Sequence, residues 1–196
     1  MKKNLIFATY LIIIFSGISK VHSIAPDIFV QSTVNRASEA LNNKYSQKEK
    51  IEKLKKIADE TVDIKGIGYY TLGAHRKSIT TDQKKQYETL FKEYFLKSFA
   101  SRLAEYSNPE IEVVSKTGLS KNYTMVSSIL VATEMRPEVK IEWRIYTKNP
   151  ENPLIRDLII EGLSLVRTQK EEFSSIIQSN DGDINALFST LKEFIK

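Results

Sequence analysis

The 196-residue sequence predicts an α+β fold, in which a roughly four-stranded, curved antiparallel sheet is covered by N- and C-terminal helices and encloses an apolar cavity. Three observations predict it. Apolar residues recur every three or four positions as far as residue 106. From residue 111 the pattern changes to the alternation typical of strands. Helical spacing returns after residue 167, and this order favours segregated helices and strands over βαβ units.

The N-terminus has the pattern of a secretory signal peptide. Two lysines precede an apolar run, Leu5–Phe15, and small or β-branched residues stand at the −3 and −1 positions of a cut after Ser23. A retained membrane anchor is the alternative, but it would need an apolar run of roughly 20 residues. We therefore expect residues 1–23 to be removed and residues 24–196 to form a single exported domain.

Charge and composition exclude several functional classes. Loss of the three basic residues of the leader leaves 26 basic against 24 acidic residues, so the net charge falls from +5 to +2 and no nucleic-acid partner is expected. The chain has no cysteine, which fits export and excludes thiol catalysis, thiolate metal sites and a lipoprotein lipobox. His75 is the only histidine after the leader, so a site with several histidine ligands is excluded.

Two helices and a bend are expected next. Pro26-Asp27 can open the first helix, whose apolar face ends at Leu41. Ser46 and Glu49 have the spacing of a capping box, in which each side chain binds the other residue's backbone amide, so a second helix begins there. The glycine-containing segment Val62–Gly73 is expected to bend, with a short helix, and to pack its aromatic residues against the body of the protein. It matches neither a P-loop nor a dinucleotide fingerprint, so a phosphate-binding loop is not favoured.

A second capping box, Thr80 and Gln83, is the strongest helix start in the chain. The helix is expected to run to about Tyr106, before Asn108-Pro109. Charged residues occupy most of one side. The broad apolar face consists of Tyr87, Leu90, Phe91, Tyr94, Phe95, Phe99, Leu103 and Tyr106.

Four strands and two helices complete the prediction. The strands cover 111–115, Tyr123–Thr133, Val139–Tyr146 and Leu154–Val166. The third alternates most cleanly, as a half-buried antiparallel strand does. Turns are expected at Thr117-Gly118 and Ser120–Asn122, and Gly162 is expected to mark a bulge or a close backbone contact. Two amphipathic helices follow, separated by a break at Asp181–Asp183.

Catalytic patterns are weak. The segment Gly162–Val166 resembles part of a nucleophile elbow around Ser164, but valine replaces the last glycine and the preceding strand is antiparallel. Asp157 and Glu161 would lie about 13 Å apart on one strand at ~3.3 Å per residue. That exceeds the ~9.5 Å limit for paired glycosidase carboxylates. Asp157 and Glu161 are therefore interpreted as solvated or salt-paired residues. The basic cluster His75–Lys77 is likewise interpreted as solvated surface.

The sequence has more apolar side chains than the predicted core needs, and this excess is informative about function. The aromatic helix and the strands that are apolar on both faces offer more apolar surface than a thin two-layer core needs. A curved sheet with helices laid across it can leave an apolar cavity for a ligand. An ordinary solid core is the alternative, and periodicity alone favours it.

The sequence resembles the MlaC family, the periplasmic lipid-binding components of the Mla system. The resemblance is carried by Leu72-Gly73, Thr80–Gln83 with the aromatic face that follows, Asp157–Val166, Arg167–Phe173 and Asp181–Ile184, over nearly the whole mature chain. His75 and Arg76 stand where members often have an aromatic pair, and Lys170 where arginine is usual. We expect the fold to tolerate these departures and the rim of the pocket to differ.

The resemblance implies a periplasmic phospholipid carrier. Such a carrier exchanges lipid with an outer-membrane lipoprotein complex and with an inner-membrane ABC transporter that bears an MCE-domain ring. Phospholipid would be the bound ligand of a monomer, with no catalytic residue, metal or other cofactor. Two alternatives stay open: an exported enzyme acting on lipid or cell wall, and a ligand-free periplasmic adaptor.

The cavity is expected between the concave sheet and the long aromatic helix. Alternation fixes which residues face inward for the third strand and leaves the second and fourth open. The expected wall consists of Phe91, Tyr94, Phe95, Phe99, Met125, Ile129, Val131, Ile141, Trp143, Ile145 and Ile160.

Overall fold

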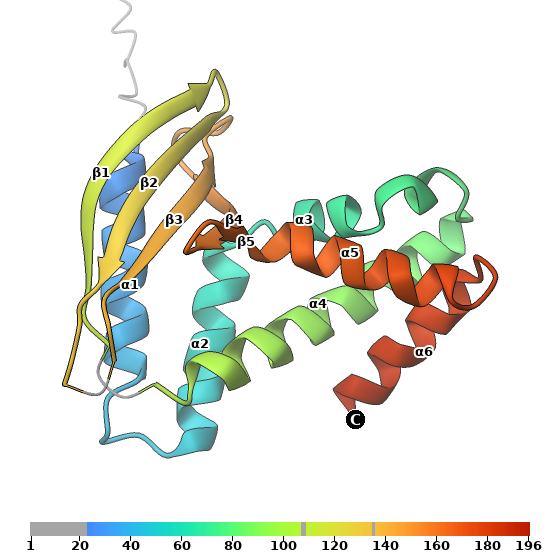
Figure 1. Cartoon of the computed structure of the whole chain (residues 1–196), viewed down its shortest axis with the longest axis horizontal. Helices are drawn as coiled ribbons and strands as arrows, with labels where there is room; N and C mark the ends of the chain where they lie inside the picture. The colour runs from blue at the N-terminus through green and yellow to red at the C-terminus, as the bar shows by residue number, and fades with distance from the viewer. Residues whose placement is uncertain (1–22, 107–108, 135) are drawn as a thin grey trace, which may run out of the picture.

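The computed structural model describes residues 23–106, 109–134 and 136–196 and has the α+β architecture that the sequence predicts (Figure 1). The elements are α1 (Pro26–Ala40), α2 (Gln47–Thr61), α3 (Ile64–Thr71), the 3₁₀ helix η1 (Gly73–Lys77), α4 (Thr81–Leu103), β1 (Ile111–Ser120), β2 (Tyr123–Leu130), β3 (Val139–Tyr146), β4 (Leu154–Ile160), β5 (Leu163–Ser164), α5 (Leu165–Gln178) and α6 (Ile184–Ile195). The expected signal peptide lies outside the described residues except for Ser23. No helix within these ranges is long and apolar enough to cross a membrane.

The strands form one sheet in the order β1-β2-β3-β4-β5, and every neighbouring pair is antiparallel. Opposite residues share a face, so Trp143 lies between Val126 and Leu158 on the inner side. Register shifts after Val113 in β1 and after Arg144 in β3 bend the strands. The result is the strongly curved sheet of Figure 1.

Both predicted capping boxes are confirmed. At the start of α2, the Glu49 amide donates to the Ser46 hydroxyl at 3.4 Å and the Ser46 amide donates to the Glu49 carboxylate at 2.8 Å. At the start of α4, the corresponding distances between Gln83 and Thr80 are 3.2 and 2.9 Å. These motifs satisfy backbone donors that the first helical turn leaves free, so they fix the two helix starts locally.

The prediction of one continuous strand over Leu154–Val166 is wrong after β4. Glu161 and Gly162 have φ angles of 49° and 81°, and two consecutive positive φ angles are what a type I′ hairpin turn requires. The chain therefore folds back as β5 and enters α5, where Ser164 is the N-cap and accepts from the Arg167 amide at 3.1 Å. Gly162 is thus a turn residue and not a bulge.

The predicted turn at Thr117-Gly118 is also wrong. These residues lie within β1 and pair with Met125 and Thr124 of β2. The turn comes later, at Lys121-Asn122, inside the other segment for which a turn was predicted. Cross-strand pairing has overridden the local turn preference of Thr-Gly.

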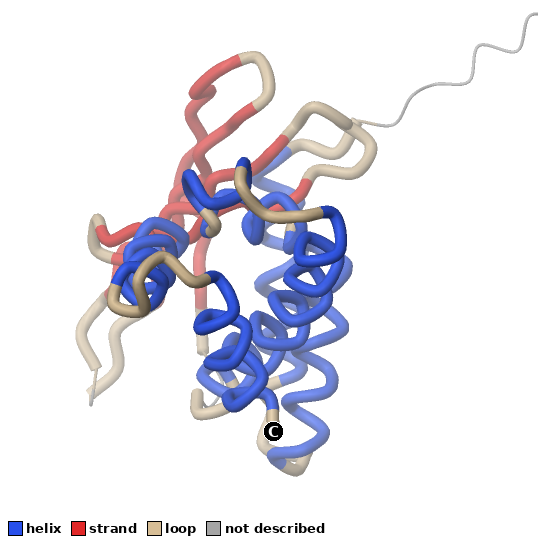
Figure 2. Tube along the Cα trace, turned by 90° about the vertical axis from the view of Figure 1, so that its right-hand side faces the viewer, coloured by secondary structure: helices blue, strands red, loops and turns tan. Residues whose placement is uncertain are grey.

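The helices cover one side of the sheet, as Figure 2 shows with the strands behind the helical layer. Helix α1 packs along β1 and β2, and α2 packs between α1 and α4. Helix α3 packs on α4 and α5, and α6 packs on the same two helices. Helix α4 therefore reaches from the sheet-covering helices to the C-terminal pair.

A solid aromatic core fills the region between α4, α5 and α6. Phe91 lies 5.6 Å from Tyr87 and 6.2 Å edge-on from Phe173, measured between ring centroids, and Tyr87 lies 6.1 Å from Phe188. The Tyr87 hydroxyl is 2.9 Å from the Thr71 hydroxyl, and burial raises the pKa of Tyr87 well above its ordinary value. These rings lock the C-terminal helices onto the first half of α4.

Helix α3 approaches this core closely at Gly68. A Cβ atom at that position would lie 2.8 Å from Cδ1 of Phe91, nearer than side chains can pack. We expect Gly68→Val to destabilise the fold by about 1–3 kcal/mol through overpacking, as measured by urea unfolding. The matched control is Gly118→Val, where an added Cβ would meet nothing within 4 Å. Equal unfolding midpoints for the two variants would contradict the close packing of α3 on α4.

Candidate functional site

An apolar cavity of about 360 Å³ lies between the inner face of the sheet and helices α1, α2 and α4. Its size falls within the roughly 300–1,000 Å³ of pockets that hold small molecules. The apolar wall consists of Val34, Ala37, Leu41, Leu54, Ile57, Ala58, Val62, Ile67, Phe95, Phe99, Leu103, Tyr106, Pro109, Ile111, Leu130, Val139, Ile141, Trp143, Ile155, Leu158, Ile160, Leu165 and Val166.

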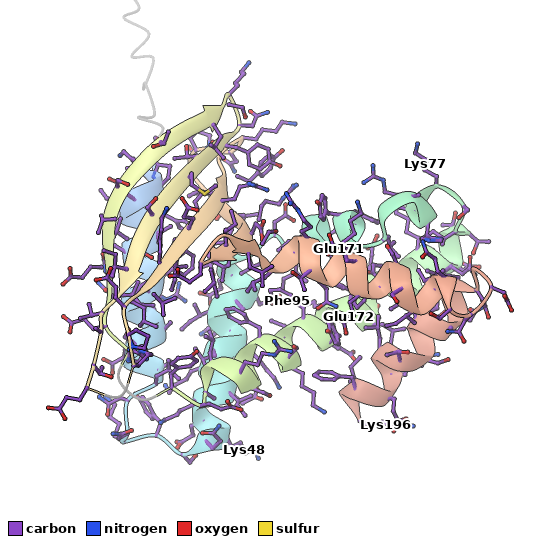
Figure 3. All side chains as sticks on the ribbon, in the orientation of Figure 1. Lys48, Lys77, Phe95, Glu171, Glu172 and Lys196 are labelled. Carbon is purple, nitrogen blue, oxygen red and sulfur yellow. The ribbon has the colours of Figure 1, made fainter. Side chains whose placement is uncertain are left out.

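Helical and strand periodicity place these side chains. Phe95, Phe99 and Leu103 are four residues apart on α4 and therefore share the face that closes the cavity. The rings of Phe95 and Phe99 stack at 5.6 Å with 8° between their planes. Phe95 is labelled in Figure 3, close to α2 in that view. Ile141 and Trp143 alternate with outward-facing residues on β3 and form the opposite wall.

The serine and threonine hydroxyl groups of the wall are satisfied by the protein itself. Thr33 and Thr61 donate to the backbone carbonyls four residues earlier, at 2.9 and 2.7 Å. Ser38 donates to the Pro109 carbonyl at 2.8 Å. Because these donors are already used, the helical side of the cavity presents an essentially apolar surface to a ligand.

Trp143 is held in one orientation by a buried hydrogen bond. Its side chain is 7% exposed and its Nε1 donates to the Ser128 hydroxyl at 2.8 Å. Ser128 is fully buried on the neighbouring strand, and its hydroxyl lies 3.3 Å from the Ile141 carbonyl, to which it donates. The indole therefore presents a fixed apolar ring to the cavity with its polar atom turned into the sheet.

Asp157 has the salt-paired structural role that the sequence favoured over catalysis. Its carboxylate is 4% exposed and accepts from the Ser164 hydroxyl at 2.6 Å and from the Val166 amide at 3.2 Å. Arg144 lies 3.6 Å away on β3. Ser164 donates its hydroxyl proton to Asp157 and accepts from the Arg167 amide in the first turn of α5, so these two side chains together anchor the start of the helix.

The structure brings five of the eleven predicted wall residues into the cavity wall: Phe95, Phe99, Ile141, Trp143 and Ile160. Phe91 and Tyr94 instead pack on Phe173 in the aromatic core. Ile145 is fully buried on the inner face of β3 but does not line the cavity. Contact of any of these residues with a ligand stays a prediction.

Three predicted residues from the second strand lie elsewhere. The buried residues of β2 are Val126, Ser128 and Leu130, so Met125 and Ile129 belong to the opposite face of the sheet. Val131 follows the end of β2 and is half-buried. The choice of face for this strand failed because both faces carry apolar residues, so alternation could not distinguish them.

Sequence reasoning missed the contribution of α1 and α2 to the wall. Leu41, Leu54, Ile57 and Ala58 line the cavity from these two helices. A signal was present, since all four belong to the apolar stripes that predicted the helices. What the stripes could not show is that they face an open space instead of a packed core.

Comparison with known proteins identifies the family and finds a solved structure with the same fold. The family model described as MlaC protein matches residues 31–193. A solved structure of a phospholipid-binding protein from Ralstonia solanacearum, in complex with a phospholipid, superposes with a TM-score of 0.72 at 20% identity. The alignment covers 88% of this chain and 97% of that chain. At this identity, the likeness to the solved structure shows a common fold.

The Trp143–Ser128 bond gives a stability test. We expect Ser128→Ala to cost about 1–3 kcal/mol, because it leaves the buried indole N–H without an acceptor. Urea unfolding measures the effect, with Ser127→Ala on the opposite face of the same strand as control. In a Trp143→Phe background the cost of Ser128→Ala should fall sharply, and an unchanged cost there would show that the hydroxyl acts through something other than the indole.

Proposed function

The chain belongs to the MlaC family, and from that premise we propose that it carries phospholipid through the periplasm with acyl chains held in the apolar cavity. The observation that carries the proposal is the cavity itself, a space of about 360 Å³ whose polar side chains are almost all satisfied internally. The phospholipid-bound relative with the same fold supports the choice of ligand.

The energetics suit a carrier. Burying one acyl chain of about 16 carbons at ~0.8 kcal/mol per methylene yields about 13 kcal/mol relative to water. A bilayer offers nearly the same, so moving the chain from membrane to protein can be close to neutral. The protein needs only to shield the tails, and no catalytic step is required of it.

The route is the finer part of the proposal. We propose that the leader, residues 1–23, directs export and is cleaved, leaving residues 24–196 as one domain. The carrier would exchange lipid with an outer-membrane lipoprotein complex and with an inner-membrane ABC transporter bearing an MCE-domain ring. Membership of the family supports this route.

The two alternatives make different predictions about purified protein. An enzyme acting on lipid or cell wall would release fatty acid or sugar, yet the Ser164 hydroxyl is committed to Asp157 and to the start of α5. A ligand-free adaptor would carry no lipid, which leaves the apolar cavity without an occupant.

Native mass spectrometry of the protein purified from a bacterial periplasm tests the carrier directly. We expect bound phospholipid in the wild type and its loss in Ala37→Phe, because the added ring would occupy the cavity that Ala37 lines. Ala74→Phe, at an exposed position of η1, is the matched control and should keep its lipid. Wild-type protein without lipid would favour the adaptor, and product release from added lipid would favour the enzyme.

Trp143 reports on occupancy because it is the only tryptophan of the chain and lines the cavity. We expect its emission to shift to shorter wavelength when delipidated protein is reloaded, because acyl chains replace water beside the ring. Fluorescence spectra before and after reloading measure the shift. Identical spectra would leave Trp143 as a core residue without lipid contact.

A further inference from the structure

Two charged residues, Asp157 and Arg136, line the cavity, and only one of them has an oppositely charged partner among the described residues. Asp157 is neutralised by Arg144 and by donors from Ser164 and Val166. The Arg136 side chain forms no ion pair with any residue that the structure describes, and its only hydrogen bond to those residues runs from Nη2 to the Val131 carbonyl at 3.1 Å. Arg136 is therefore a positively charged wall residue without a counter-charge among the described residues.

The guanidinium of Arg136 also holds an unsatisfied donor. Its Nε is buried and has no acceptor among the described residues. Buried N–H groups are nearly always paired in native proteins, with protein, water or ligand. A missing partner leaves the desolvation of the donor uncompensated. An oxygen-rich ligand group reaching this guanidinium would supply both the acceptor and the counter-charge.

Tyr106 places this arginine where the cavity meets solvent. The Tyr106 ring lines the cavity, is 42% exposed and lies 5.9 Å from the guanidinium carbon of Arg136. An aromatic ring beside a guanidinium restricts its orientation without neutralising its charge. The planar donors of arginine match the oxygens of a phosphate group better than those of any neutral ligand group.

The two charges lie at different ends of β3. Arg136 comes three residues before Val139, the first residue of the strand, whereas Asp157 pairs with Arg144. Arg144 comes five residues after Val139, which is about 17 Å along the strand at ~3.3 Å per residue. The cavity thus has an unpaired positive charge at one end and a neutralised carboxylate at the other, with apolar wall between them.

We infer that Arg136 binds the phosphate of a bound phospholipid and thereby orients it, with the headgroup at Tyr106 and the acyl chains running along Trp143 and α4. This inference rests on the proposed function and adds a specificity to it. A diacyl lipid that lacks phosphate would fill the same cavity but would gain nothing from Arg136.

The test is competition between two lipids with the same acyl chains. Delipidated protein is incubated with mixed vesicles of dioleoylphosphatidylglycerol and dioleoylglycerol, and the retained lipids are quantified by mass spectrometry. We expect wild type to prefer the phospholipid over the diacylglycerol and Arg136→Gln to lose about tenfold of that preference, the order expected for a hydrogen bond to a charged group. Retained diacylglycerol would show that Arg136→Gln still folds with an intact cavity.

Arg76→Gln is the matched control, because it removes the same charge from an exposed position of η1 outside the cavity wall. An unchanged preference in Arg136→Gln, or an equal loss in Arg76→Gln, would overturn the inference while lipid binding by wild type would uphold the carrier. Wild type that retains neither lipid would overturn the carrier itself. Inorganic phosphate is titrated alone, and Arg136-dependent binding without any lipid preference would assign the arginine to free phosphate instead.

Discussion

The aromatic stripe of α4 is the feature on which the rest of the structure depends, because one continuous face of this helix packs in two different ways. In its first half, Tyr87 and Phe91 are buried against Phe173 and Phe188, and these contacts make a solid core. Further along, Phe95 and Phe99 have the same spacing but no rings from α5 or α6 packed on them, and they face the cavity. The N-terminal half of α4 is therefore buried in a packed core that stabilises the fold, and its C-terminal half lines the cavity.

Strand β4 joins the sheet to both groups of helices. The Asp63 amide donates to the Ile155 carbonyl at 2.9 Å, while the Asp63 carboxylate caps α3 and pairs with Arg156. At the next residue of the strand, Asp157 accepts a hydrogen bond from the Val166 amide in the first turn of α5. Two buried or half-buried carboxylates therefore tie the starts of α3 and α5 to neighbouring residues of β4.

How far sequence could predict this structure depends on the range of the interactions involved. The capping boxes at Ser46 and Thr80 are local, so the starts of α2 and α4 followed from a few residues each, and the α+β class followed from the apolar periodicity within each segment. The hairpin at Glu161-Gly162 is equally local, but glutamate is uncommon at positive φ, and the strand-like residues beyond it concealed the turn. Which face of β2 points inward, and which residues of α1 and α2 line the cavity, depend on contacts between distant segments. The pattern of apolar residues within one segment cannot predict those contacts.

An apolar cavity that the protein does not fill has an energetic consequence for the proposed carrier. In the lipid-free protein, wall atoms lack the dispersion contacts that a packed core would provide. A lipid that fills the cavity restores them, so the loaded form is the more stable one by mass action.

Release of the lipid cannot be explained by the cavity alone, because an apolar wall has the same affinity for lipid at the donor membrane and at the acceptor. It requires an acceptor that binds the empty form more tightly than the loaded form, because a partner shifts an equilibrium only by its differential affinity for the two states. Of the described cavity wall, the end near Tyr106 and Arg136 is where such an acceptor could discriminate, since the Arg136 Nε there has no acceptor among the described residues.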